Sequence, residues 1–64
     1  MTETEFWERM TAHFGADYAR YWANQTVIEA LGGRTPVEAI NDGVGFKTVW
    51  RAVWAFLELP ASLR

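Results

Sequence analysis

The sequence predicts an all-α fold: one compact domain, residues 1–64, built as a bundle of about four helices with no sheet. Apolar residues recur at three- and four-residue steps in several segments, which is the period of a helix. No run alternates apolar and polar residues as a half-buried strand does. Glycine and proline divide the chain into short segments without a linker or repeat. The predicted helices lie near 4–14, 16–31, 35–42 and 46–58.

The first predicted helix begins after Thr2, which stands three residues before Glu5 in the spacing of a capping box. Gly15 provides a stop at the other end. The apolar face of this helix consists of Phe6, Met10 and Phe14, with Trp7 beside them. The segment is therefore predicted to be an amphipathic helix that packs on the rest of the chain.

The second segment, 16–31, is predicted to be either one bent helix or two short ones. Thr26 and Glu29 repeat the capping spacing in its middle, so a new helix can begin there. Gly32-Gly33 ends the segment in either case. Its two apolar patches do not align on one face, and they consist of Tyr18, Tyr21 and Trp22, then Val27, Ile28 and Leu31.

The third helix has the sharpest start signal in the chain. Thr35 is a capping residue, Pro36 stands at the first helical position where no N–H is needed, and Glu38 completes the box. The helix is short, because the Asn-Asp-Gly run 41–43 predicts a C-cap and a turn.

The last helix, 46–58, carries the longest apolar stripe and is predicted to organise the fold. We expect its two indole rings, Trp50 and Trp54, to be buried beneath the three preceding segments. Pro60 ends the helix near Leu59, which leaves residues 61–64 as a short tail. The stripe consists of Phe46, Val49, Trp50, Val53, Trp54 and Leu57, and Phe56 widens one edge.

Composition narrows the classes of function. The chain has no cysteine, which excludes disulfides and thiolate zinc sites. In 64 residues, its four tryptophans, four phenylalanines and two tyrosines are needed first for the core. The net charge of -2 argues against general attraction to nucleic acid or anionic membranes. No apolar run approaches the length of a membrane span, and the amino terminus is acidic, so we expect a cytoplasmic protein.

The residues that could carry catalysis are few. His13 is the single histidine, lies at the edge of the first apolar face, and has Arg9 one turn before it. Glu5 and Glu8 indicate a solvated helix face. The glycine pair 32–33 before Arg34 lacks the strand and motif of a phosphate loop. We therefore expect no enzyme activity, no cofactor and no metal site.

Four blocks of sequence occur in this order: TEFWERM, FGADYAR, ALGGRTPVEAI and VWRAV. Together they resemble a small actinobacterial family catalogued as a domain of unknown function (DUF 3046). The resemblance implies a stand-alone cytoplasmic helical protein, in many genomes encoded close to recombination genes, without an established activity, cofactor or catalytic residue. This chain departs from the family pattern at Gly45-Phe46, where the family tends to place an aspartate and a proline, so a capping side chain is lost.

The small size of the chain, its few residues suited to catalysis and its high aromatic content favour a protein-interaction or regulatory module. Its partner is an unidentified protein or a second copy of the chain. Tryptophan dominates interface hot spots, and Trp7 and Trp22 are the candidate anchors, because Trp50 and Trp54 are expected in the core.

The alternative is a DNA-binding protein that uses residues 35–58 as a helix-turn-helix. Its close-packing residue, turn glycine and apolar residue would be Ala39, Gly43 and Val49. The acidic net charge argues against this function. The DNA contacts would come from Arg34, Lys47, Thr48 and Arg51.

Overall fold

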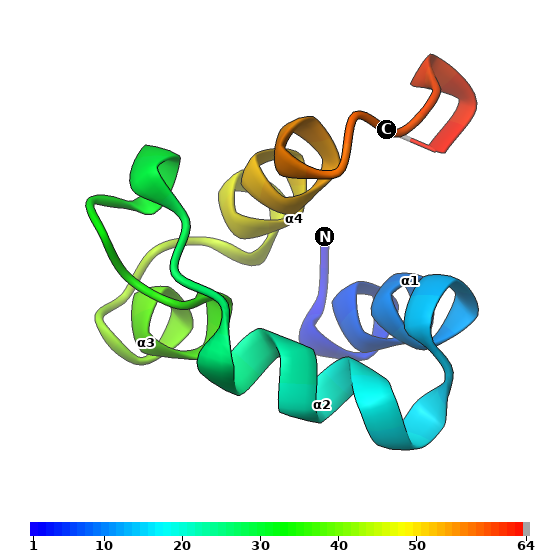
Figure 1. Ribbon diagram of the computed structural model, residues 1–64, viewed down its shortest axis with the longest axis horizontal. Coiled ribbons are helices and arrows are strands. Elements are labelled where there is room, and N and C mark those ends of the chain that lie inside the picture. The colour runs from blue at the N-terminus through cyan, green and yellow to red at the C-terminus, as the bar shows by residue number, and fades with distance from the viewer. Residues whose placement is uncertain (64) are drawn as a thin grey trace.

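The computed structural model describes residues 1–63 and confirms the all-helical fold, with no strand in that part of the chain. α1 packs on α2, α2 on α3, α3 on α4, and α4 returns to α1, so the helices form a closed ring (Figure 1). The elements are α1 (Glu3–Phe14), α2 (Ala16–Gln25), the 3-10 turn η1 (Glu29–Leu31), α3 (Pro36–Asn41), α4 (Phe46–Phe56) and the 3-10 turn η2 (Ala61–Leu63).

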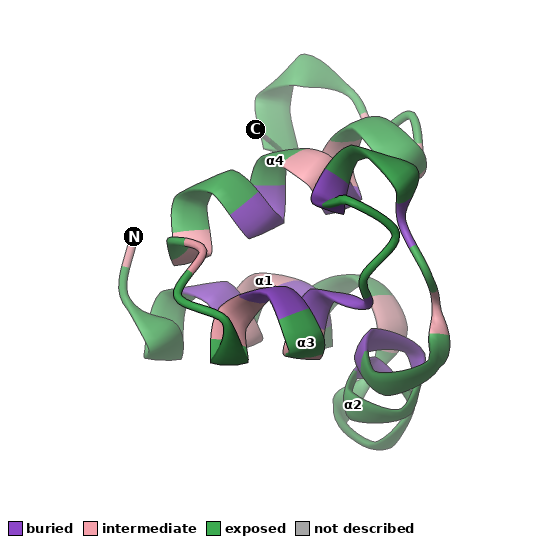
Figure 2. Cartoon of the chain, turned by 90° about the vertical axis from the view of Figure 1, so that its left-hand side faces the viewer, coloured by how far each residue is buried: buried purple, intermediate pink, exposed green. Residues whose placement is uncertain are grey.

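The core lies inside the ring of helices, where the buried faces of α1 and α4 point toward each other (Figure 2) and α2, η1 and α3 add buried side chains. Trp50 is buried as predicted, with 3% of its surface exposed. Trp54 is only half-buried, so the expectation that both indole rings lie beneath the preceding segments is wrong for this residue. The buried apolar side chains are Phe6, Met10, Ala19, Trp22, Ala23, Ile28, Leu31, Ala39, Val49, Trp50 and Val53.

α1 begins and ends where its signals predict. The Thr2 hydroxyl accepts a hydrogen bond from the Glu5 N–H at 3.1 Å, which satisfies one of the free donors at the helix start. The Glu5 carboxylate lies 3.7 Å from the Arg9 guanidinium, one turn further along. Gly15 ends the helix at φ 89°, a conformation that other residues rarely adopt. α2 starts at the next residue, so the two helices meet at a tight corner.

The middle segment is not one bent helix, because α2 ends at Gln25, and in place of a second short α-helix the structure has only the three-residue 3-10 turn η1. Thr26 ends α2 and does not cap a new helix. Ile28 has an extended backbone and forms an isolated antiparallel bridge with Arg34, its N–H donating to the Arg34 carbonyl at 3.0 Å. The Ile28 side chain is buried, so its burial and the bridge together prevent a continuous helix.

α3 carries the predicted capping box. The Thr35 hydroxyl accepts from the Glu38 N–H at 3.1 Å, and the Glu38 carboxylate accepts from the Thr35 N–H at 2.9 Å. The helix closes with a Schellman motif, in which the Val44 N–H donates to the Ala39 carbonyl and Gly43 adopts φ 93°. The turn into α4 is therefore set by the backbone of Gly43.

α4 starts without a side-chain cap, as the Gly45-Phe46 departure predicts. It ends at Phe56, two residues before the predicted limit. Its C-terminus is a second Schellman motif, in which the Leu59 N–H donates to the Trp54 carbonyl. The left-handed position of this motif is filled by Glu58, at φ 54°, and not by glycine.

The predicted short tail is residues 61–64, but its described part, together with Leu59 and Pro60, folds back on α4, and we call residues 59–63 the C-terminal segment. The Trp54 indole N–H donates to the Pro60 carbonyl at 2.9 Å. The Trp50 indole N–H donates to the Leu63 carbonyl at 3.1 Å. Both indole donors thus find partners in the segment that follows their own helix.

Candidate functional site

A row of aromatic side chains crosses from the α1–α2 corner to the end of α4, and we call it the aromatic ridge. Its rings touch in sequence: the centroid of Phe14 lies 4.5 Å from that of Trp22 and 6.0 Å from that of Tyr18. Tyr18 lies 5.8 Å from Tyr21, and Trp22 lies 6.0 Å from Phe56. Five rings from three helices are therefore joined into one surface feature.

Two of the ridge residues are buried or half-buried and form its base, and the other three are exposed. Trp22 is 8% exposed and belongs to the core, and Phe14 is half-buried. Tyr18, Tyr21 and Phe56 are 50%, 58% and 50% exposed. Water therefore reaches about half of each of these residues; the two tyrosines stand side by side, and Phe56 joins the row through Trp22. This grouping distinguishes the ridge from an isolated surface aromatic.

Helix geometry explains why α2 exposes its tyrosines. Ala19 and Ala23 are four residues apart, both are fully buried, and they place the small face of α2 against the rest of the fold. Tyr18 and Tyr21 lie outside this alanine face. The short alanine side chains allow α2 to approach its neighbours closely, so the helix has no room to turn the larger rings inward.

The rim of the ridge is acidic. Asp17 lies one turn before Tyr21 on α2, and Glu58 follows Phe56 by two residues. Both acidic residues are exposed. Arg20, the nearest basic residue in the sequence of α2, is engaged elsewhere, because its guanidinium lies 4.2 Å above the Trp7 ring. The ridge thus has one exposed acidic residue, Asp17, a helical turn from Tyr21, and a second, Glu58, two residues past Phe56 in the chain.

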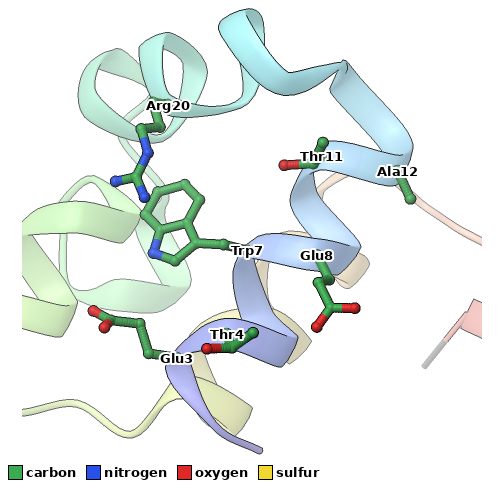
Figure 3. Close-up of a pocket in the computed structure, with 7 residues that line it drawn as sticks. All are labelled: Glu3, Thr4, Trp7, Glu8, Thr11, Ala12 and Arg20. Carbon is green, nitrogen blue, oxygen red and sulfur yellow. The ribbon is translucent and has the colours of Figure 1, made fainter.

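Trp7 and Arg20 form the wall of an open groove on the other flank of α2 (Figure 3). The indole is half-buried, with its edge against Phe6 at 5.1 Å, and the guanidinium covers one of its faces. The cation already occupies the face that a ligand would stack on. The groove is lined by Glu3, Thr4, Trp7, Glu8, Thr11, Ala12 and Arg20.

The two predicted anchors thus lie on different sides of α2. Trp22 supports the base of the aromatic ridge, and Trp7 lines the groove. The structure does not bring them together into one site.

One comparison with known proteins gives a match. The model of a family described as "Protein of unknown function (DUF3046)" matches residues 1–62. The chain belongs to the DUF3046 family. No curated protein and no solved structure matches the chain.

The basic residues predicted to contact DNA are exposed in this DUF3046 chain, but they differ in their surroundings. Lys47, Thr48 and Arg51 lie on the solvent side of the first turns of α4. Arg34 lies 3.5 Å from the Asp42 carboxylate, which neutralises it. The packing positions of the motif are as expected, since Ala39 and Val49 are fully buried.

Residues 1–63 contain no group of three side chains that could hold a metal ion. His13 is exposed, with its ring 4.7 Å from Phe14. None of the helices within 1–63 combines the length and the apolar character needed to cross a bilayer.

Periodicity alone predicts that the exposed residues of the ridge belong to the apolar faces of their helices. Tyr18 and Tyr21 form the first patch of the middle segment, and Phe56 is the edge of the last stripe. The signal that separates them from the core is the alanine pair, Ala19 and Ala23, whose spacing marks the face that packs closely. A helix whose small residues are buried leaves its aromatic flank exposed.

Proposed function

We propose that this DUF3046 chain is a small interaction module, without catalytic activity, that binds another protein through the aromatic ridge. The observation that carries the proposal is the exposure of Tyr18, Tyr21 and Phe56 beside a core that is already closed. Tyrosine and phenylalanine are enriched at protein interfaces because they bury large areas with few rotatable bonds. Self-association through the same ridge is the competing version of the proposal.

The chemistry of the ridge describes its partner. Exposed rings pack best against aliphatic or aromatic side chains, so the centre of the partner surface is apolar. The carboxylates of Asp17 and Glu58 favour lysine or arginine at its edge. We therefore expect a partner surface with an apolar centre and a basic rim, and binding that weakens as salt rises.

The test compares an exposed side chain of the ridge with an equally exposed side chain outside it. Tyr21 and Val27 are equally exposed, at 58%, but Val27 is not one of the ridge rings and lies beyond the end of α2. A photo-reactive phenylalanine analogue placed at position 21 is expected to crosslink a protein from the native host, and the same analogue at position 27 is not. Affinity for that protein should fall about fivefold in Tyr21→Ala, because a half-exposed tyrosine at an interface contributes on the order of 1 kcal/mol.

The control variant is Val27→Ala, which should bind as the unchanged chain does. Sedimentation equilibrium of the purified chain tests self-association separately. Crosslinking that is equal from positions 21 and 27, or capture that is unchanged in Tyr21→Ala, would remove the ridge as the binding surface.

DNA binding by the α3–turn–α4 unit is the second candidate function. It is favoured by the agreement of Ala39, Gly43 and Val49 with the packing of a helix-turn-helix. Lys47 and Arg51 stand four residues apart on one face of α4, and no ion-pair partner is found for either among residues 1–63. Two phosphate contacts of this kind support weak, salt-sensitive binding.

A labelled duplex titrated at low salt tests this candidate. DNA binding through α4 requires that the Lys47→Ala/Arg51→Ala variant bind more weakly, with a salt dependence reduced by about two in the log-log slope. Thr48→Ala should change the affinity less, because its hydroxyl carries no charge. Identical titrations of the unchanged chain and the double variant would exclude the α4 surface.

A further inference from the structure

We propose that α1 and α4 form a peptide-binding groove, and that the C-terminal segment, residues 59–63, is its built-in occupant. The ligand is a segment of a partner protein with the same pattern, Leu-Pro-x-x-Leu, which displaces the chain's own segment. This site uses none of the ridge rings, and the proposal does not rest on binding through the ridge.

The first observation is the pair of indole donors. Trp50 and Trp54 stand one turn apart on α4, and their N–H groups donate to the carbonyls of Leu63 and Pro60 at 3.1 and 2.9 Å. The acceptors are backbone atoms, which any peptide of suitable shape supplies. Aromatic-lined grooves that recognise proline-containing segments use the same combination of ring surface and donor.

The second observation is that the segment fills the groove incompletely. A cavity of about 330 Å³ remains between the segment and α1. Leu63 is 46% exposed although its carbonyl accepts a bond from the buried Trp50. A partner segment with larger side chains would bury more surface than the occupant does. The cavity is lined by Arg9, Ala12, His13, Trp50, Leu59, Ser62 and Leu63.

The third observation concerns the connection to α4. Glu58 links the helix to the segment at φ 54°, in the left-handed region that favours glycine. The Schellman motif that ends α4 sets this conformation. It turns the chain so that the segment runs back to the Trp54 and Trp50 indole donors.

The occupant's own sequence provides the probe. A fluorescein-labelled peptide, Glu-Leu-Pro-Ala-Ser-Leu, corresponds to residues 58–63. We titrate it against the full-length chain and against Leu63→Asp, which weakens the apolar contact of the internal segment. Leu63→Asp is expected to bind the peptide at least fivefold more tightly than the unchanged chain, because the internal competitor is weakened.

Adding Trp54→Phe to Leu63→Asp should reverse this gain, since the ring remains but its N–H donor is lost. Arg51→Ala, on the solvent side of the same helix, is the matched control and should have no effect. Absence of saturable binding to Leu63→Asp, or binding that Trp54→Phe leaves unchanged, would overturn the proposal.

The unchanged chain provides an independent measurement. Peptide at millimolar concentration should shift the indole N–H resonances of Trp50 and Trp54 and leave that of Trp7 in place. A shift confined to Trp7 would contradict the proposed location. A dimer of the unchanged chain that disappears in Leu63→Asp would assign the groove to a second copy's segment and overturn the choice of partner.

Discussion

Phe6→Ala is expected to lower the free energy of unfolding by about 3–5 kcal/mol, the range for removing a buried phenylalanine. Phe6 is fully buried, and its ring lies 5.8 Å from that of Phe46 at the start of α4. A domain of this size has a total stability of about 3–10 kcal/mol. Much of the Phe6→Ala population should therefore be unfolded at 25 °C, as measured by urea denaturation followed by circular dichroism.

Phe56→Ala is the matched control, because it makes the same substitution at a ring that is 50% exposed. It should cost about 1 kcal/mol or less, since the lost ring was largely in contact with water. Equal losses for the two variants would show that Phe6 does not hold α1 to α4.

Gly43→Ala should destabilise the protein by about 1–2 kcal/mol, and Glu58→Gly should stabilise it by about 0.5–1 kcal/mol. Both residues occupy the left-handed position of a Schellman motif, at φ 93° and 54°. An added Cβ at Gly43 meets no atom within 4 Å, so the cost there is backbone strain and not a clash. Thermal unfolding should move down by roughly 5–15 °C for Gly43→Ala and up by several degrees for Glu58→Gly.

Two further substitutions separate the effect of backbone conformation from the effects of an added side chain at position 43 and of the charge at position 58. Gly43→Asn should lose less than Gly43→Ala, because asparagine tolerates the left-handed region. Glu58→Gln removes the charge and keeps the strain, so its melting temperature should match that of the unchanged chain. A stabilising effect of Glu58→Gln as large as that of Glu58→Gly would attribute the gain to charge.

The sequence predicts a helix boundary correctly where a few adjacent residues, such as a capping box, determine where the helix begins or ends. Thr35, Pro36 and Glu38 specify the start of α3, and the structure shows the bonds that their spacing predicts. The middle segment was left open because Ile28 pairs with Arg34 across a loop that includes two left-handed glycines. A bridge between residues six apart leaves no periodic pattern in the sequence.

The candidate binding features were harder to predict because they depend on which face of a helix is covered. The tyrosines of α2 have the spacing of core residues, and only the burial of Ala19 and Ala23 shows that they face outward. The position of residues 59–63 depends on hydrogen bonds from Trp50 and Trp54 to residues thirteen and six positions further along the chain, which nothing in the local sequence marks. The sequence analysis named Trp7 and Trp22 as candidate anchors, whereas the exposed large aromatics are Tyr18, Tyr21 and Phe56.

The ring of helices has a consequence for the folding pathway. Each helix contacts its neighbour in sequence, and the ring is completed only when α1 reaches α4. Sequential contacts form quickly, and closing a single long loop carries most of the entropic barrier. The contact between the aromatic side chains of Phe6 and Phe46 forms in that closing step. The rate of folding therefore depends on how often α1 meets α4.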